Sequence, residues 1–197
     1  MRKAAFFDRD GVINIDYGFV GKIENYDLIE GVASSLKELK DMGYLLVLVT
    51  NQSGIARGKY TESDFFKVTS FMQANLSLYD ACFDGIYFCP HHPEAPIEKY
   101  RCICECRKPK SGMFKSAATD LGIDLKSSIM IGDHASDLIA AKGAGISNLF
   151  LVGEHIETEK SKISDAKCLK DLVQVVKMLK NENKQLTFYI DYKYPIH

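Results

Sequence analysis

The residues best suited to chemistry are Asp8 and Asp10, which stand two positions apart directly after the apolar run Ala4–Phe7. Two carboxylates this close repel each other unless a cation lies between them. At ~4 Å and an effective dielectric constant near 20, the repulsion is on the order of 4 kcal/mol. A hard divalent ion such as Mg²⁺ removes this repulsion and prefers oxygen ligands. The alternative is a solvated acidic turn without function.

Three polar residues that lie far apart in the chain share one kind of position. Asp8, Thr50 and Asp133 each stand at the end of a predicted buried strand. In an open α/β sheet, ligands bind outside the carboxyl ends of the strands, so these residues are expected to meet in one crevice. Lys108 would add a cation to this group.

Four of the six cysteines fall in one short stretch. Cys89 and His91 form one closely spaced pair, and Cys104 and Cys106 form another. Three thiolates and one imidazole match a closed tetrahedral zinc site. We therefore predict a structural zinc in the loop 89–106, without a catalytic role, and the alternative is a reduced cluster without metal.

Several polar or sulfur-containing residues keep open assignments. Cys102 is interpreted as a bystander, with competition for the metal as the alternative, and His92 faces either substrate or solvent. Asp137 is either a metal-site residue or an ordinary helix cap. Cys82 and Cys168 are predicted to be small buried apolar groups.

Short apolar runs alternate with helical patterns along the chain. Strand patterns cover residues 4–7, 44–49, 83–88, 128–131 and 149–152, and helical patterns cover 32–42, 61–78, 112–121, 136–144 and 169–180. This alternation predicts the α/β class, with a single Rossmann-like, doubly wound parallel sheet. One domain would span 1–185. In 186–197, apolar residues recur at period two, which predicts an extra strand, or else a loosely ordered terminus.

Length and charge limit the class of partner. The 197 residues are 46% hydrophobic and fit one domain, and the net charge of -1 favours neither nucleic acid nor anionic membrane. The apolar stretch at the N-terminus is too short for a signal peptide, and no segment approaches the length of a membrane span. We expect a cytoplasmic protein that acts on a small molecule, as a monomer or as a dimer formed through its tail.

Four motifs carry a family resemblance. The segment 8–14 (DRDGVIN) resembles the nucleophile motif of the haloacid dehalogenase (HAD) superfamily, and its later motifs resemble 49–58, 107–109 and 132–137. With CPHHP and CEC in the cysteine-rich loop, they look like the branch of heptose bisphosphate phosphatases, which is close to the histidinol-phosphate phosphatases. The resemblance covers roughly 4–152, and the spacing of the motifs leaves no room for a large cap domain.

The resemblance implies a Mg²⁺-dependent phosphatase with a phosphorylated sugar as substrate. It would remove the C7 phosphate of D-glycero-D-manno-heptose 1,7-bisphosphate through an aspartyl-phosphate intermediate, in the biosynthesis of nucleotide-heptose for lipopolysaccharide. One alternative is histidinol phosphate or another small sugar phosphate. A catalytically idle, zinc-stabilised binding module is an alternative from another class, which the intact acidic motifs disfavour.

The same resemblance implies roles for individual residues. Asp8 would be the nucleophile, and Asp10 the general acid and later the base. Mg²⁺ would be held by Asp8, Asp133 and the backbone carbonyl of Asp10, while Thr50 and Lys108 stabilise the transferred phosphoryl group. The further substrate-binding residues would be Asp16, Tyr17, Gly18, Phe19, Asn51, Gln52, Ser53 and Arg107.

Overall fold

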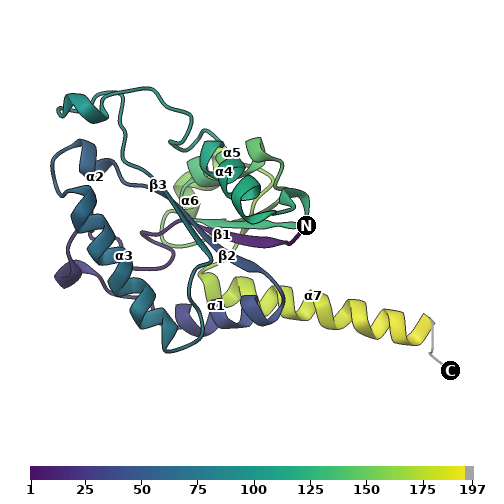
Figure 1. Ribbon diagram of the computed structural model, residues 1–197. Helices are drawn as coiled ribbons and strands as arrows, with labels where there is room; N and C mark the ends of the chain where they lie inside the picture. The colour runs from purple at the N-terminus through teal and green to yellow at the C-terminus, as the bar shows by residue number, and fades with distance from the viewer. Residues whose placement is uncertain (194–197) are drawn as a thin grey trace.

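Six parallel strands form one sheet in the order β3-β2-β1-β4-β5-β6 (Figure 1). The computed structural model describes the backbone of residues 1–193 and the side chains of residues 1–182. The strands are β1 (Ala4–Phe7), β2 (Leu45–Asn51), β3 (Gly85–Cys89), β4 (Ile129–Gly132), β5 (Asn148–Leu151) and β6 (Lys167–Cys168). The strand order reverses direction between β1 and β4, which is where an α/β sheet opens a crevice for a ligand.

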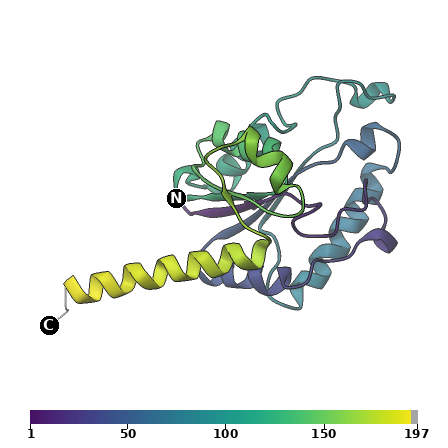
Figure 2. The ribbon, with the colours of Figure 1, turned by 180° about the vertical axis from the view of Figure 1, so that it is seen from behind.

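Helices cover both faces of the sheet (Figures 1 and 2). One face packs against α1 (Val32–Asp41), α3 (Glu62–Ser77) and α7 (Leu172–Lys193), and the other against α4 (Gly112–Leu121) and α5 (Ala135–Ala144). Alternate residues of β1 enter the two cores, so the whole strand is buried. Burial on both faces explains the uninterrupted apolar run of this strand.

The predicted doubly wound parallel sheet is confirmed, and the elements missed are short. These are β6, α2 (Ser53–Ala56) and α6 (Ile156–Glu159), which are too short to establish a hydrophobic period. Cys168 was predicted to be buried, but it is exposed, because it lies in the two-residue edge strand β6.

The extra strand predicted in 186–197 was wrong for residues 186–193. The helix α7 continues to Lys193 instead, and residues 194–197 lie outside the described part of the chain. No glycine or proline occurs between Leu172 and Lys193 that would end the helix. The alternation of apolar residues was therefore a weaker signal than the absence of a helix stop.

The long loop between β3 and α4 stands above the sheet, close to α2 (Figure 1). It is attached to the domain by ordinary contacts. Ala95 is buried, the backbone amide of Ile97 donates to the carbonyl of Ala56, and the hydroxyl of Tyr100 donates to Glu62 at 2.7 Å. The middle of this loop therefore has its own anchors on α2 and α3.

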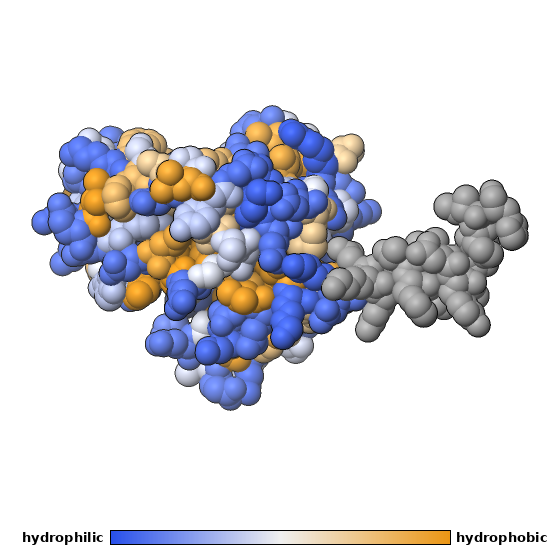
Figure 3. All heavy atoms as spheres, turned by 90° about the horizontal axis from the view of Figure 1, so that it is seen from below, coloured by the Kyte–Doolittle hydropathy of each residue, from blue (hydrophilic) through white to orange (hydrophobic). Residues whose placement is uncertain are grey.

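Polar and apolar residues are interspersed over the lower face of the molecule (Figure 3). Within the part of the chain that is described, no helix combines the length and the apolar character needed to span a bilayer.

The start of α3 provides a test of the fold that is independent of the site. Thr61 Oγ1 accepts from the backbone amide of Asp64 at 3.1 Å, and the carboxylate of Asp64 accepts from the amide of Thr61 at 3.0 Å. We expect Thr61→Ala to lower the free energy of unfolding by about 1 kcal/mol in urea denaturation. Thr61→Ser keeps the hydroxyl and is the control. An equal loss in both variants would assign the effect to the methyl group.

Candidate active site and metal-binding loop

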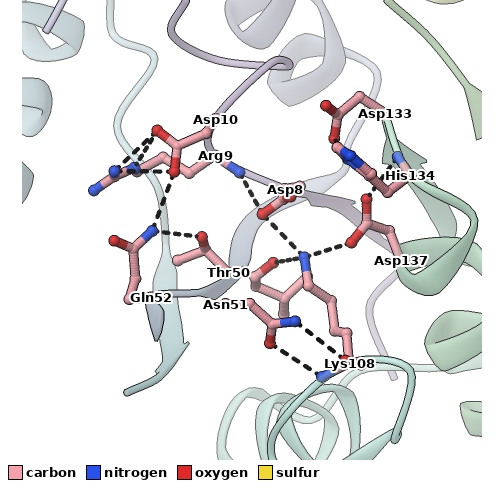
Figure 4. Close-up of polar contacts among 11 residues, drawn as sticks. Asp8, Arg9, Asp10, Thr50, Asn51, Gln52, Lys108, Asp133, His134 and Asp137 are labelled. Atoms are coloured by element: carbon pink, nitrogen blue, oxygen red, sulfur yellow. Dashed lines mark hydrogen bonds and ion pairs between the residues drawn. The ribbon is translucent and has the colours of Figure 1, made fainter. Parts of the chain in front are cut away.

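A buried lysine lies at the centre of the site (Figure 4). The Nζ atom of Lys108 lies 2.9 Å from Asp8 Oδ1 and 2.7 Å from Asp137 Oδ1, and it donates to the carbonyl of Val49 at 2.9 Å. Its side chain is 1% exposed. Burial acts to lower the pKa of Lys108, but the two carboxylates outweigh it and raise that pKa above its usual value. Lys108 is therefore a cation held between two anions.

Two neighbouring segments place Lys108. The side-chain amide of Asn51, the last residue of β2, donates to the carbonyl of Lys108 and accepts from its backbone amide, both at 3.1 Å. Arg107 donates to the carbonyl of His91 at 3.2 Å. The backbone around Lys108 is thus tied both to the sheet and to the cysteine-rich loop.

Three carboxylates surround this lysine. Oxygen atoms of Asp8, Asp133 and Asp137 lie within 4.8 Å of one another. Burial raises the pKa of Asp8 to about 6, against the opposing effect of Lys108, and burial also raises the pKa of Asp133. Once ionised, the three acids and Lys108 carry three negative charges and one positive charge, so about two negative charges remain uncompensated.

This arrangement fits a hard divalent cation. The Oδ1 atom of Asp133 is buried and has no hydrogen-bond partner, and carboxylate oxygens are the donors that Mg²⁺ prefers. The backbone passes close to these acids only because residue 11 is glycine. Gly11 has φ +78°, and a Cβ atom there would lie 2.4 Å from Asp133 Oδ2.

Asp10 has a cationic partner of its own, which the electrostatic argument from the sequence did not include. Its carboxylate turns to Arg9, whose Nη2 lies 2.9 Å and 3.0 Å from the two oxygens (Figure 4). Asn14 and Gln52 donate to the same carboxylate at 3.0 Å and 3.3 Å. Each acid of the motif therefore has its own cation, and only the backbone carbonyl of Asp10 remains for the predicted role in Mg²⁺ binding.

Arg9 was not predicted as a site residue, because charged side chains are rarely fully buried. It is 0% exposed, and its Nη2 also donates to the carbonyl of Val20 at 2.6 Å. Since Arg9 and the two amides fix both oxygens of Asp10, they act as positioning residues for that carboxylate.

The polar groups at the end of β2 and just after it form more hydrogen bonds within the protein than expected. The hydroxyl of Thr50 is buried and accepts from Gln52 Nε2 at 2.9 Å. The backbone amide of Gln52 donates to the carbonyl of Cys89 at 2.8 Å, so it is not free for a phosphate oxygen. Asn51 and Gln52 thus position Lys108 and Asp10, while substrate contact by Thr50, Asn51, Gln52 and Ser53 stays a prediction.

The four predicted metal ligands of the loop come together in space. The Sγ atoms of Cys89, Cys104 and Cys106 lie 3.1 to 3.5 Å apart, and Nδ1 of His91 lies 3.8 Å from Cys89 and 3.5 Å from Cys106. Cys102 is exposed and outside this set. The group, called here the cysteine tetrad, forms a possible metal site.

Positive groups lie at the border between this loop and the site. Nη2 of Arg57 lies 3.0 Å from Nε2 of His92. Burial and the charges of Arg107 and Arg57 lower the pKa of His92. Arg57 belongs to the 49–58 motif, whose residues 55–58 favour a heptose bisphosphate by resemblance. Its contact with His92 could not be predicted from the sequence, because it depends on how the loop packs.

An acidic cavity of about 470 Å³ also borders Asp133. Its charged and titratable lining residues are Asp16, Asp133, Glu154, Asp171, Lys170 and His155. Four carboxylates thus face one lysine and one histidine. Of the predicted 16–19 segment, Asp16 lines this cavity, whereas Tyr17 is exposed and bonded to Asp27 at 2.8 Å, and Phe19 is exposed.

Comparisons with known proteins agree with this geometry. A family model described as HAD-hydrolase-like matches residues 105–175. The D-glycero-beta-D-manno-heptose-1,7-bisphosphate 7-phosphatase of Haemophilus ducreyi is 50% identical over 178 residues, covering 89% of this chain and 97% of that protein. The enzyme of the same name from Escherichia coli is 47% identical, covering 88% and 94%.

A solved structure gives the same relationship in three dimensions. The D,D-heptose 1,7-bisphosphate phosphatase from B. bronchiseptica, complexed with magnesium and phosphate, matches with a TM-score of 0.81 and 30% identity. The match covers 91% of this chain and 99% of that chain. The chain belongs to the heptose-1,7-bisphosphate phosphatase family of HAD-like hydrolases.

Proposed function

We propose that the chain is a Mg²⁺-dependent phosphatase that removes the C7 phosphate of D-glycero-β-D-manno-heptose 1,7-bisphosphate. The observation that carries this proposal is Lys108, buried between Asp8 and Asp137 at the point where the sheet opens. The names of relatives at 47% and 50% identity support the substrate and the β anomer. The magnesium and phosphate in the related structure support the metal.

The chain's own residues account for both steps of the reaction. A carboxylate oxygen of Asp8 attacks phosphorus, the bond from phosphorus to the sugar O7 breaks, and Asp10 gives its proton to that oxygen. Asp10 then takes a proton from water, whose oxygen attacks the phosphorus of the aspartyl-phosphate and releases inorganic phosphate. Thr50 and Lys108 stabilise the charge on the phosphoryl oxygens.

The metal would be held by Asp8, Asp133 and the backbone carbonyl of Asp10. When bound, Mg²⁺ offsets the repulsion between the carboxylates and the anionic phosphate. Asp137 then serves Lys108 through its 2.7 Å contact, and its second oxygen accepts from the backbone amide of His134 at 3.1 Å. From these two contacts we infer that Asp137 is a positioning residue for Lys108.

The distribution of charge favours a bisphosphate over histidinol phosphate. Arg57 and Arg107 offer donors and positive charge at the border of the cysteine-rich loop, which suits a second phosphate group. Histidinol phosphate carries an ammonium group instead of a second phosphate, and the two guanidinium groups would repel it. A binding module without activity is disfavoured, because the site keeps its nucleophile, proton donor and buried cation.

Turnover of the β and α anomers of the heptose bisphosphate and of histidinol phosphate, each with and without Mg²⁺, tests the function. We expect the highest kcat/KM for the β anomer and no turnover without the metal. Asp8→Asn should remain folded and lose more activity than the 10²–10⁴-fold typical of a lost general base, because an amide is no nucleophile. A variant that keeps more than about a hundredth of the rate would remove Asp8 from the nucleophile's role.

Arg107→Ala tests recognition of the second phosphate. A charge-assisted hydrogen bond contributes roughly 1.5–3 kcal/mol, so we expect a rise of about 10-fold or more in KM for the bisphosphate and little change for p-nitrophenyl phosphate. Lys99→Ala removes an exposed charge from the same loop and is the control. Equal losses on both substrates would mean that Arg107 acts at the transferred phosphoryl group.

We further infer that the cysteine tetrad holds a structural Zn²⁺. Zinc bonds of about 2.3 Å to sulfur and 2.0–2.1 Å to nitrogen put tetrahedral ligands roughly 3.4–3.8 Å apart, and the observed separations are 3.1 to 3.8 Å. Burial raises the pKa of the Cys89 thiol, so a nearby cation is needed to keep it as a thiolate. Four protein ligands leave no open position for chemistry.

Cys106→Ser tests what this metal does. Zinc content should fall, while the domain stays folded by circular dichroism, because the middle of the loop keeps its contacts with α2 and α3. Lys108 follows Cys106 by two residues, and a misplacement of about 1 Å in a catalytic group can cost ~100-fold in rate. We therefore expect kcat to fall by about that factor. Normal kcat in a folded, zinc-free variant would separate the tetrad from the placement of Lys108.

A further inference from the structure

A second group of metal-ligand side chains lies beside the carboxylates, away from the cysteine tetrad. It consists of Asp133, His134 and His155, and one ligand atom from each lies within 4.8 Å of the others. Nδ1 of His134 is 2.9 Å from Oδ1 of Asp133, and the centroids of the two imidazole rings are 5.3 Å apart. Neither histidine has a role in the proposed reaction.

The atoms of this group are available to a ligand. Both histidines are exposed. The Oδ1 atom of Asp133 is buried, and its neighbour is Nδ1 of His134 at 2.9 Å, the separation of an ion pair. The pair places an imidazole nitrogen and a carboxylate oxygen side by side, so a metal ion that replaces the proton of His134 reaches both atoms.

The fold fixes the two histidines relative to each other. His134 is the residue before α5, and His155 is the residue before α6. Glu159 on α6 accepts from the backbone amide of Ala135 at 2.9 Å, and this carboxylate is nearly buried. The bond links the starts of the two helices, so the imidazoles are brought together without the need for a ligand.

The surroundings favour a cation. Asp133 and His155 both line the 470 Å³ cavity, whose other acids are Asp16, Glu154 and Asp171. Imidazole nitrogen is a good ligand for zinc and other transition metals, whereas Mg²⁺ prefers oxygen throughout. A site with two imidazoles and one carboxylate therefore selects a different ion from the neighbouring trio of acids.

We propose that Asp133, His134 and His155 form a second metal site, which binds Zn²⁺ or a similar transition-metal ion, and that its occupation inhibits the enzyme. Asp133 belongs to both sites. When its free oxygen binds the transition metal, it is no longer available to hold Mg²⁺, so the two ions compete. The binding stands on geometry alone, and only the inhibition rests on the proposed function.

Metal binding is measured directly by equilibrium dialysis of the zinc-loaded protein against Zn²⁺ at a fixed Mg²⁺ concentration. We expect two zinc ions per wild-type chain, one tight in the cysteine tetrad and one weaker. His155→Gln removes one of the three ligands, so the affinity for the second zinc should fall by at least 10–100-fold. Even mutation of a residue that only hydrogen-bonds to a metal ligand lowers metal affinity by that factor. His92→Gln removes a half-buried imidazole away from this group and should leave the affinity for the second zinc as in the wild type.

Two results of the dialysis would overturn the proposal. One is the absence of a second zinc from the wild type up to about millimolar concentration, and the other is an unchanged second affinity in His155→Gln. The contact between His134 and Asp133 would then be an ion pair only, and His155 would not be a metal ligand. These outcomes can be read even if the chain hydrolyses none of the substrates.

Inhibition is tested separately on the turnover of the bisphosphate. Added Zn²⁺ should inhibit the wild type, and raising Mg²⁺ should relieve the inhibition. His155→Gln should keep its activity without added zinc and need at least about 10-fold more Zn²⁺ for half inhibition. Equal sensitivity of the two proteins would mean that zinc displaces Mg²⁺ from Asp8, Asp133 and the backbone carbonyl of Asp10 without the histidines, and the inhibitory role would be dropped.

Discussion

The structure depends on one buried cation among several buried anions. Lys108 is almost without solvent contact, and its ammonium group touches Asp8 and Asp137, with Asp133 in the same group of acids. A buried ion pair that loses one partner destabilises a protein by about 3–5 kcal/mol. The chain therefore has to deliver this lysine to the carboxyl ends of β1 and β4 with little freedom. A bound ligand that carries charge must likewise be paired with groups of opposite charge at this site.

Segments far apart in the sequence meet this requirement together. Asp8 comes from the end of β1 and Asp137 from α5, while Asn51 at the end of β2 holds the backbone of Lys108. The cysteine tetrad ends two residues before the lysine. A metal in the tetrad would thus act on catalysis through backbone geometry, without touching the substrate. Arg9 does for Asp10 what Lys108 does for Asp8, so the nucleophile and the proton donor are held by separate cations.

Much of this could be predicted from the sequence, for reasons that the structure makes plain. Strands buried on both faces show as apolar runs, and the polar residues that end them must meet, because parallel strands share one carboxyl edge. The tetrad was recognised from its ligand types and spacing. Arg9 and the pair of histidines were missed, because their roles depend on neighbours that only tertiary packing supplies. The end of α7 was missed because period two in a short segment is a weaker signal than the absence of glycine and proline between Leu172 and Lys193.

The two sides of the crevice carry opposite charge, and this polarity follows from local residues. The side of the cysteine-rich loop presents Arg57 and Arg107, whereas the cavity beyond Asp133 presents mainly carboxylates. The chain as a whole has a net charge of only -1, so its overall field attracts neither sign strongly. Exposed charges are screened over about 8 Å at physiological ionic strength. Discrimination by charge therefore depends on the residues inside the crevice. The guanidinium groups of Arg57 and Arg107 would attract a second phosphate, and the carboxylates of the cavity would repel it. The cavity lined by carboxylates instead favours cations and uncharged hydroxyl groups.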